Sequence, residues 1–459
     1  MLENIKYLSV QLPEDIRRQL EAGYFSKAVK LIDRRLEGEL PLALRKCLEL
    51  QKAQLPIWEA EYPISYEEAL SVLCLNIRDF TGEEFEELIE QGVFDWIYRD
   101  GKMYFIRTFY ENLLKVQHPV TGRLAAPQKP EEQEEKQAVL NRNMNDMKEH
   151  GGNAYRIHIR STLKVKGEED AGDRITVHLP IPNAGTQVRK IRLIGIPSDA
   201  VIAPEDFESR TVCFQRPYVK GDTFTVEYEY ENHVAYTEPD PGIVEAEQPD
   251  FCLEEQAPHI LFTPFIRSLY EEIVGEETNP LLKARKIYDY ITLNVRYSYV
   301  RKYSIIRNIA EYAGINQKGD CGIQALLFIT LCRYGGVPAR WQSGLFAAPY
   351  DIGGHDWAQF YVAPYGWLFA DLSFGGSSHR TGNEERRCFY FGNLDPFRMP
   401  ANSAFQHEFT PPKKHMRQDP TDNQYGECEY GHRALRADEY EIKHEILEIC
   451  RIPWEGEKR

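Results

Sequence analysis

The spacing of apolar residues changes twice along this chain, and each change limits the fold. Up to about residue 120 they recur every three or four positions, as at Val29, Ile32 and Leu36, which is typical of helices that bury one face. Over residues 153–235 they alternate with polar residues, which is typical of half-buried strands. From residue 258 helical and strand-like segments are mixed. A single repeating architecture is therefore excluded.

These changes predict a multidomain α+β protein. In chain order we expect a helical domain at 1–125, a charged linker at 126–152, a β-sandwich at 153–236, a linker at 237–257, an α+β core at 258–400 and a C-terminal extension at 401–459. The polar segment 126–152 fits either a linker or a solvated helix.

The net charge of the chain limits the kinds of partner that we expect it to bind. The 459 residues include 55 Lys and Arg against 71 Asp and Glu, a formal net charge of −16. A surface of that sign repels nucleic-acid phosphates and anionic membranes. No apolar run approaches the ~20 residues of a membrane helix. The first residues lack a secretory h-region, and the nine cysteines are scattered. We therefore expect a cytoplasmic protein that binds neither nucleic acid nor membranes.

One cysteine lies where a nucleophile would be activated. The segment 318–322, Lys-Gly-Asp-Cys-Gly, opens an apolar stretch to Tyr334 that predicts a buried helix. The first turn of a helix has free N–H groups and the positive end of the dipole, which lower a cysteine's pKa and can hold an oxyanion. Cys321 is therefore a candidate nucleophile, although a lone cysteine at a glycine-rich turn is more often a buried structural residue.

His355 and Asp371 are its candidate partners. His355 begins an apolar strand after Gly353-Gly354, and Asp371 ends another apolar strand sixteen residues later. A buried acid is costly unless it is paired. An acid paired with His355 would fix the imidazole tautomer, so the three residues form a nucleophile, a base and an orienting acid.

The hairpin between these strands tests this arrangement. Direct opposition of His355 and Asp371 requires a loop centred on Ala363. The stronger turn signal is Pro364-Tyr365-Gly366, because Pro suits the second turn position and Gly a left-handed one. A turn there slides the two residues apart, so we expect a bulge or an irregular loop to correct the register.

Three blocks resemble the core of the transglutaminase-like superfamily: Ala284–Tyr299, Gly319–Arg340 and His355–Asp371. The G-D-C…G-V-P-A-R and H-x-W…G-W…D patterns are moderately specific alone and strong together. The resemblance implies a papain-like core, with Cys321 as nucleophile on a helix and His355 and Asp371 on adjacent strands. Gly322-Ile323-Gln324 stands where many members have an acidic residue, which affects substrate preference. The resemblance does not cover residues 1–250.

Four further residues are candidates for the cleft. Asn316 and Gln317 precede the nucleophile and can supply an amide N–H to an oxyanion, although polar loop residues are common at such positions. Tyr297 and Trp357 can line the cleft, but large aromatic residues are at least as often part of the core.

We expect no metal and no cofactor. The set His407, His415, Cys428 and His432 has no standard zinc spacing. The acids Asp351, Asp356 and Asp395 lie in no calcium-binding loop pattern.

Together these features predict acyl transfer from an amide through a thioester on the cysteine. Water is the default acceptor, so we expect a peptidase or amidase acting on a peptide or protein amide. The alternatives are a true transglutaminase with an amine acceptor, or a non-catalytic scaffold that keeps the core. The oligomeric state stays open.

Overall fold

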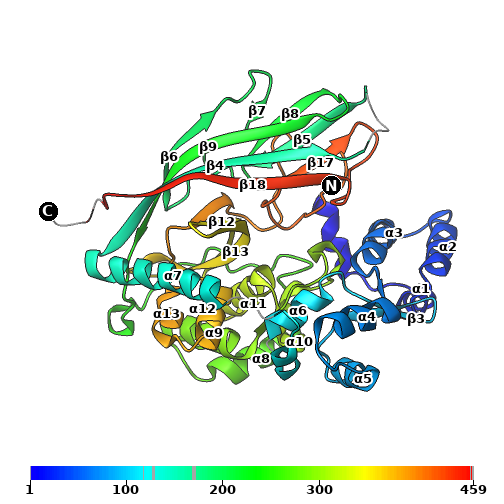
Figure 1. Ribbon diagram of the computed structural model, residues 1–459, viewed down its shortest axis with the longest axis horizontal. Helices are drawn as coiled ribbons and strands as arrows, with labels where there is room; N and C mark the ends of the chain where they lie inside the picture. The colour runs from blue at the N-terminus through cyan, green and yellow to red at the C-terminus, as the bar shows by residue number, and fades with distance from the viewer. Residues whose placement is uncertain (1, 117, 127–129, 168–171, 455, 457–459) are drawn as a thin grey trace.

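The computed structural model describes residues 2–116, 118–126, 130–167, 172–454 and 456. It is a mixed α+β protein with helices first and antiparallel sheets after them (Figure 1). The N-terminal elements are η1 (Leu2–Ser9), α1 (Glu14–Glu21), α2 (Phe25–Leu36), α3 (Leu42–Glu61), β1 (Ile64–Ser65), α4 (Tyr66–Asn76), α5 (Gly82–Glu90), β2 (Trp96–Arg99), β3 (Lys102–Phe105), α6 (Phe109–Val116) and η2 (Pro119–Arg123).

Short sequence signals determine a helix start and a hairpin turn in this first region. Thr81 and Glu84 form a capping box at the start of α5. Asp100 and Gly101 have φ values of 49° and 78°, and they turn the chain between β2 and β3. Apolar side chains of these elements, among them Phe105, share one buried cluster.

The polar segment after residue 126 is not a free linker. Residues 127–129 lie outside the described residues, and α7 (Pro130–His150) follows them. Leu140, Met144 and Met147 of α7 are buried, because the helix packs on the start of β4 and on α13.

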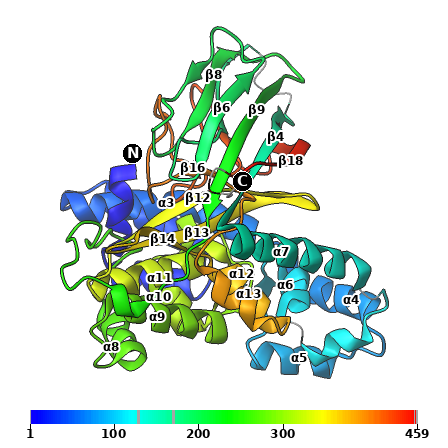
Figure 2. The ribbon, with the colours of Figure 1, turned by 90° about the vertical axis from the view of Figure 1, so that its left-hand side faces the viewer.

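Two four-stranded sheets enclose one apolar cluster above the rest of the molecule (Figure 2). Their strand orders are β18-β4-β9-β6 and β17-β5-β8-β7. The strands are β4 (Gly152–Val165), β5 (Arg174–Pro180), β6 (Val188–Ile194), β7 (Val201–Ile202), β8 (Thr211–Pro217), β9 (Thr223–Ala235), β17 (Glu427–Tyr430) and β18 (Tyr440–Ile452).

The C-terminal part is therefore more ordered than its irregular, polar sequence indicates. β17 pairs with β5, and β18 pairs with β4 along its whole length. Both partners lie more than 200 residues earlier in the chain, so periodicity within the tail could not identify its sheets.

The remaining elements form a five-stranded antiparallel sheet, order β15-β14-β13-β12-β16, with helices packed against it. They are η3 (Pro241–Ile243), α8 (Pro264–Val274), α9 (Pro280–Asn294), β10 (Arg296–Tyr297), η4 (Tyr303–Ile305), α10 (Ile309–Asn316), β11 (Lys318–Gly319), α11 (Cys321–Tyr334), β12 (Ala339–Ala348), β13 (Asp351–Val362), β14 (Gly366–Ala370), α12 (Leu372–Arg380), α13 (Glu384–Phe389), β15 (Phe391–Gly392) and β16 (Arg398–Asn402).

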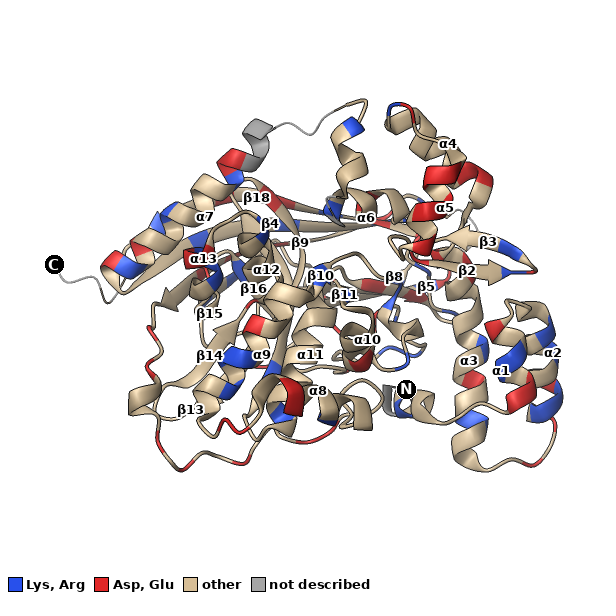
Figure 3. Ribbon diagram, turned by 90° about the horizontal axis from the view of Figure 1, so that it is seen from below, with Lys and Arg blue, Asp and Glu red and all other residues tan. Residues whose placement is uncertain are grey.

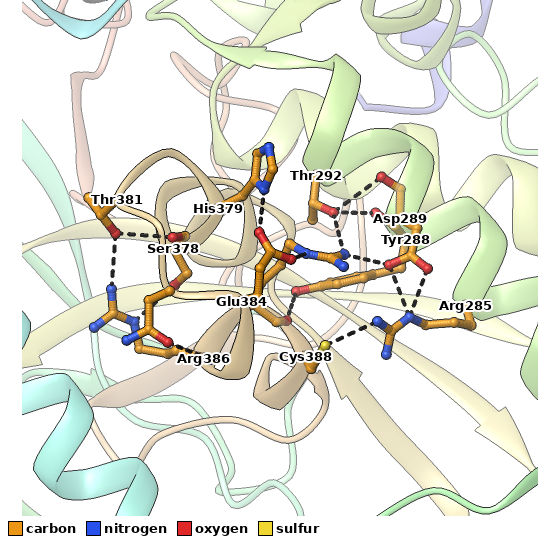
Figure 4. Close-up of polar contacts among 12 residues, drawn as sticks. Arg285, Tyr288, Asp289, Thr292, Ser378, His379, Thr381, Glu384, Arg386 and Cys388 are labelled. Atoms are coloured by element: carbon orange, nitrogen blue, oxygen red, sulfur yellow. Dashed lines mark hydrogen bonds and ion pairs between the residues drawn. The ribbon is translucent and has the colours of Figure 1, made fainter.

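A short parallel pair, β10 and β11, leads into α11 and lies between α6 and α12 (Figure 3). α12 is held in turn by α9 and α13. Arg387 of α13 binds Asp289 of α9, and Glu384 of α13 binds His379 of α12 (Figure 4). α12 is thus fixed along its length, from the end of β14 to the β10–β11 pair.

In the part of the chain that the structure describes, no helix is both long enough and apolar enough to span a membrane.

Candidate active site

Cys321 is the first residue of α11, as expected. Asp320 caps this helix, its Oδ1 accepting from the N–H of Ile323 at 3.2 Å. The N–H groups of Cys321 and Gly322 make no hydrogen bond with the described residues. The start of α11 therefore presents two free donors beside the sulfur atom.

Space beside the sulfur depends on Gly322. A Cβ atom there would lie 2.3 Å from the hydroxyl of Tyr303 and 2.7 Å from Oδ2 of Asp356. The Tyr303 hydroxyl donates to Asp320. Glycine therefore lets two polar side chains approach the first turn of α11, which any larger residue would push away.

The thiol has an unexpected partner. It donates to Oδ2 of Asp356, with 3.3 Å between sulfur and oxygen. Oδ1 of Asp356 accepts from Nε2 of Gln424. In the described part of the chain the thiol makes no hydrogen bond to His355, the neighbour of Asp356 in sequence. Cys321 thus reaches β13 at the residue next to the expected base.

This environment raises the pKa of the thiol. Cys321 is 8% exposed. Burial raises the pKa of Cys321 well above its usual value, and the carboxyl groups of Asp356 and Asp320 raise it further. The expectation that the helix N-terminus lowers this pKa is therefore wrong, because burial and neighbouring acids outweigh the helix dipole.

The pKa values of the acids around the thiol are raised as well. Burial raises the pKa of Asp320 to about 6. Burial, followed by the negative charge of Asp320, raises the pKa of Asp356 well above its usual value. The carboxyl of Asp422 lies against Asp356, and its pKa is raised too, mainly by burial. The thiol therefore faces a carboxyl group that is far more basic than a solvated one.

His355 and Asp371 are bonded directly. His355 lies on β13, and its Nε2 is 2.8 Å from Oδ2 of Asp371, the N-cap of α12. Asp371 is fully buried, and it also accepts from the N–H of Phe374 at 3.1 Å. The other ring nitrogen of His355, Nδ1, makes no hydrogen bond with the described residues. The imidazole is thus held from one side and free on the other.

The hairpin register explains how they meet. Val362 pairs with Gly366, so the loop is centred on Pro364, as the turn signal predicts. Asp371 therefore falls opposite Trp357, two positions from His355. Residues two apart on a strand share a face, and diagonal neighbours lie within reach of long side chains. The expectation that a bulge must correct the register is wrong: a diagonal contact is sufficient.

Arg398 completes this network. It is fully buried on β16, and its Nη2 and Nε lie 2.7 and 3.2 Å from Oδ2 of Asp371. Its Nη1 lies 3.0 Å from Oδ1 of Asp395, and its guanidinium covers the ring of Phe374, 4.0 Å from the ring centre. Arg398 thus neutralises Asp371 and fixes its orientation.

This pairing sets the charges at rest. Burial alone would raise the pKa of Asp371, but His355 and Arg398 lower it well below its usual value. Burial lowers the pKa of His355, and Arg398 lowers it further, which outweighs the opposite effect of Asp371. The resting site therefore holds a neutral thiol, a neutral imidazole and an ionised Asp371.

The cleft candidates separate into two groups. Tyr297 pairs with Gly319 just before the nucleophile. Burial raises the pKa of Tyr297, and a negative charge on Cys321 would raise it further. Trp357 belongs to the core: it is fully buried, and its indole N–H donates to Gln342 at 2.7 Å.

The two amide candidates do not reach the sulfur atom. Nδ2 of Asn316 donates to the carbonyl of Tyr312 in its own helix at 2.8 Å. Gln317 ends α10 in the left-handed conformation with its side chain exposed. The free N–H groups of α11 occupy the place where an oxyanion donor is needed.

Sequence reasoning missed Arg398 and Gln424, and it weighed Asp356 solely as a calcium ligand. A charged residue inside the apolar run around Phe397 and Met399 is the signal for Arg398, since a buried cation needs a partner. Gln424 lies in an irregular segment and carries no comparable signal.

The described residues bring one set of metal-type ligands together: His158, Glu229 and Glu448. Arg192 lies 3.2 Å from Glu229, and Arg156 lies 3.6 Å from Glu448. Because arginines already pair with these acids, we assign no metal to this group.

The metal ligands weighed in the sequence are used otherwise. Asp395 binds Arg398, Cys428 is buried in β17, and His432 lies 3.3 Å from Asp173. These residues are therefore engaged in ordinary packing and ion pairs.

Comparison with known proteins places the core in a family. Residues 267–372 match the family described as the transglutaminase-like superfamily. This segment runs from α8 to the start of α12 and includes Cys321, His355 and Asp371. The chain thus carries a core domain of the transglutaminase-like superfamily.

Several solved structures are similar over larger parts of the chain. A proposed cysteine protease from Cytophaga hutchinsonii is 16% identical, with 66% of this chain and 90% of that one covered and a TM-score of 0.37. The periplasmic domain of TgpA from Pseudomonas aeruginosa is 13% identical, with coverages of 53% and 94% and a TM-score of 0.28. A proposed protease from Parabacteroides distasonis is 13% identical, with coverages of 48% and 46% and a TM-score of 0.20. No curated protein matches the chain.

Proposed function

We propose that this protein is a cysteine-dependent enzyme that transfers the acyl group of an amide through a thioester on Cys321. One observation carries the proposal: the thiol of Cys321 donates a hydrogen bond to Asp356, the residue directly after His355, while His355 is hydrogen-bonded to buried Asp371. A nucleophile, a base and an orienting acid thereby come from α11, β13 and the end of β14 in a papain-like arrangement.

In the first step, sulfur attacks the amide carbonyl. The free N–H groups of Cys321 and Gly322 are the donors for the oxyanion, supported by the positive end of α11. The hydroxyl of Tyr297 is a further candidate, since this residue pairs with Gly319 just before the nucleophile. The C–N bond then breaks and leaves a thioester on Cys321.

His355 handles the proton. Because Asp371 holds Nε2, Nδ1 is the ring atom left to accept the thiol proton and deliver it to the departing amine. Asp371 and Arg398 keep the ring oriented throughout. In the resting state the bond to Asp356 holds the thiol in its protonated form.

The second step is hydrolysis. Water attacks the thioester, and a carboxylic acid is released as the thiol is restored. We favour hydrolysis over capture by an amine because water needs no acceptor site. The substrate is then a peptide or protein amide, and the enzyme is a peptidase or amidase.

Turnover of a mixed library of internally quenched peptides tests this function. We expect cleavage by the full-length protein, none by Cys321→Ala, and a loss of about 10²- to 10⁴-fold in His355→Gln, as for a removed general base. Cys388→Ala is the matched control, because Cys388 is an exposed cysteine away from the site.

Three other outcomes have clear meanings. In the presence of methylamine, release of the peptide's amine fragment together with a methylamide in place of the carboxylic acid would identify a transglutaminase. Equal turnover by wild type and Cys321→Ala would reject the proposal. Absence of turnover and of any adduct on Cys321 would favour a non-catalytic scaffold.

A further inference from the structure

Three cationic side chains gather beside the candidate nucleophile: Lys115, Lys136 and Arg380, here called the basic rim. Nζ of Lys115 lies 5.8 Å from the ring centre of Tyr297 and 5.9 Å from that of Tyr299. Tyr297 pairs with Gly319, and the N–H of Ser298 donates to the carbonyl of Gly319, so this segment lies beside the residues that lead into Cys321.

Lys115 is placed there by α6. Asn112 of α6 binds the backbone of Tyr299 twice: its Oδ1 accepts from the N–H at 2.7 Å and its Nδ2 donates to the carbonyl at 2.9 Å. Lys115 comes three residues after Asn112, which is close to one helical turn, so the two side chains lie on the same side of α6. The helix is thus fixed against β10 with its lysine over the two rings.

Arg380 and Lys136 approach from two other helices. Arg380 ends α12, the helix capped by Asp371, and α12 packs on β10 (Figure 3). Lys136 of α7 lies 5.6 Å from the ring centre of Tyr350, in the turn between β12 and β13, and 3.9 Å from Asp351. Three separate helices, α6, α12 and α7, therefore contribute the cations of the basic rim.

The acid that pairs with this group is Asp351, an exposed residue 3.9 Å from Lys136. In the described part of the chain, neither Lys115 nor Arg380 has a carboxylate within ion-pair distance. Burial lowers the pKa of Lys115, the charges of Lys136 and Arg380 lower it further, and Asp351 raises it in part. Like charges that face one another in this way favour an anion between them.

We propose that the basic rim binds a carboxylate of the substrate next to the amide that Cys321 attacks. This inference rests on the proposed function and names its substrate class: acidic peptides, with the carboxylate supplied by an Asp or Glu side chain or by a free C-terminus. The net charge of −16 does not oppose this, because charges beyond about 10 Å are screened at 0.1 M salt.

Matched peptide libraries test the class. Three internally quenched libraries differ solely in carrying Glu, Gln or Lys, and a fourth has a free instead of an amidated C-terminus. We expect the full-length protein to prefer carboxylate-bearing peptides, and the preferred library identifies the carboxylate's source. Lys115→Gln and Arg380→Gln should each lower kcat/KM for that library by about 5-fold, with little change for Gln peptides.

The matched control is the pair Lys102→Gln and Arg174→Gln, two exposed cations away from the site. These changes should leave the preference intact. Arg380→Glu should shift it toward Lys peptides. An unchanged Glu-to-Gln preference in the Lys115→Gln/Arg380→Gln double variant would overturn the inference.

A second readout is independent of turnover. Iodoacetate and iodoacetamide form the same S–C bond and release the same iodide, but the first carries a carboxylate. We expect the rate ratio of iodoacetate to iodoacetamide at Cys321, mapped by mass spectrometry, to fall in the double variant and in 1 M salt. A ratio that is the same in wild type and double variant would contradict the rim.

The two readouts separate the two proposals. Cleavage without any dependence on Glu, Lys115 or Arg380 rejects the inference and leaves the function. A variant-sensitive reagent ratio without cleavage of any library rejects the function and supports the anion site. No cleavage and no modification of Cys321 by either reagent reject both.

Discussion

Cys321 lies among carboxyl groups, so its thiol holds its proton more tightly than a solvated cysteine does. The closest of these groups is Asp356, whose Oδ2 is 3.3 Å from the sulfur. Burial raises the pKa of Asp356 well above its usual value, so this carboxyl group holds a proton strongly, and once ionised it opposes a thiolate at that distance. Asp356 therefore keeps the resting nucleophile protonated until a substrate displaces the bond.

Replacing Asp356 by Asn should make the thiol more acidic. Because burial is retained while a carboxyl group is removed, we expect the pH midpoint of Cys321 alkylation by iodoacetamide to fall by about one unit. Quantitative mass spectrometry of the Cys321 peptide over a pH series measures it. Asp351→Asn, at an exposed acid on the same strand, is the control, and identical midpoints for wild type and Asp356→Asn would show that the carboxyl group has no such influence.

Removing Arg398 should be strongly destabilising. Arg398→Met removes the cation that pairs with buried Asp371 and leaves the neutral imidazole of His355 beside it, so we expect a loss of about 3–5 kcal/mol in the free energy of unfolding. Urea denaturation measures this loss. Adding Asp371→Asn to Arg398→Met should restore part of it, since the unpaired charge is gone. A double variant less stable than Arg398→Met would argue against this ion pair.

At the scale of elements, α12 links the parts of the site. It begins after Asp371, carries Phe374 against His355, and ends at Arg380. Its place is set by α9, whose Tyr288 hydroxyl lies where a Cβ atom on Gly375 would be, 2.0 Å away. α12 can therefore lie close to α9 solely because Gly375 has no side chain.

Gly375→Ala should push α12 away from α9. Tyr288 is buried and its hydroxyl donates to the carbonyl of Arg387, so it cannot move freely. We expect a loss of about 1–3 kcal/mol in the free energy of unfolding, typical of overpacking, together with lower peptidase activity as Asp371 shifts. Gly167→Ala is the control, because nothing lies within 4 Å of the added Cβ. Equal stability of the two variants would contradict this packing.

Local sequence predicted the elements that bear the triad. The apolar stretch that begins at Cys321 predicted the start of α11, and Pro364 and Gly366 correctly predicted the hairpin register. The contact between His355 and Asp371 was predictable as a pair, but its diagonal geometry was not, because it depends on side-chain reach. The roles of Asp356 and Arg398 could not be assigned from the sequence. Asp356 meets Cys321 of α11, and Arg398 meets Asp371, through tertiary folding.

At the scale of the whole molecule, distant parts of the chain close around the core. β17 and β18 complete the two upper sheets, and Gln424 from the same tail donates to Asp356. His259, which precedes α8, packs on Phe405 with 5.8 Å between ring centres. The tail therefore contributes both to the fold and to the surroundings of Cys321.

The burial of His259 makes the stability of the folded chain depend on pH. It is fully buried, neither ring nitrogen has a hydrogen-bond partner among the described residues, and burial lowers its pKa to about 3. Below about pH 6.5 this histidine binds a proton in the unfolded chain but not in the folded chain. The part of the folding stability that depends on a neutral His259 is therefore present above pH 6.5 and is lost as the pH falls.

His259→Phe should remove that loss. Between pH 7 and pH 5 the free energy of unfolding should fall by about 2 kcal/mol less in the variant than in wild type. Urea denaturation at both pH values measures the difference, with His432→Gln, at an exposed histidine, as control. The same fall in both proteins would mean that His259 is protonated in the folded state.

The central claim is that an acyl group passes through the sulfur of Cys321. Intact-protein mass spectrometry during the first turnover of a cleaved peptide tests it most directly. We predict a transient adduct equal to the acyl fragment, mapped to Cys321, released by hydroxylamine and absent in Cys321→Ala. Amide cleavage that proceeds without any adduct on Cys321, or with the adduct on another residue, would contradict the account.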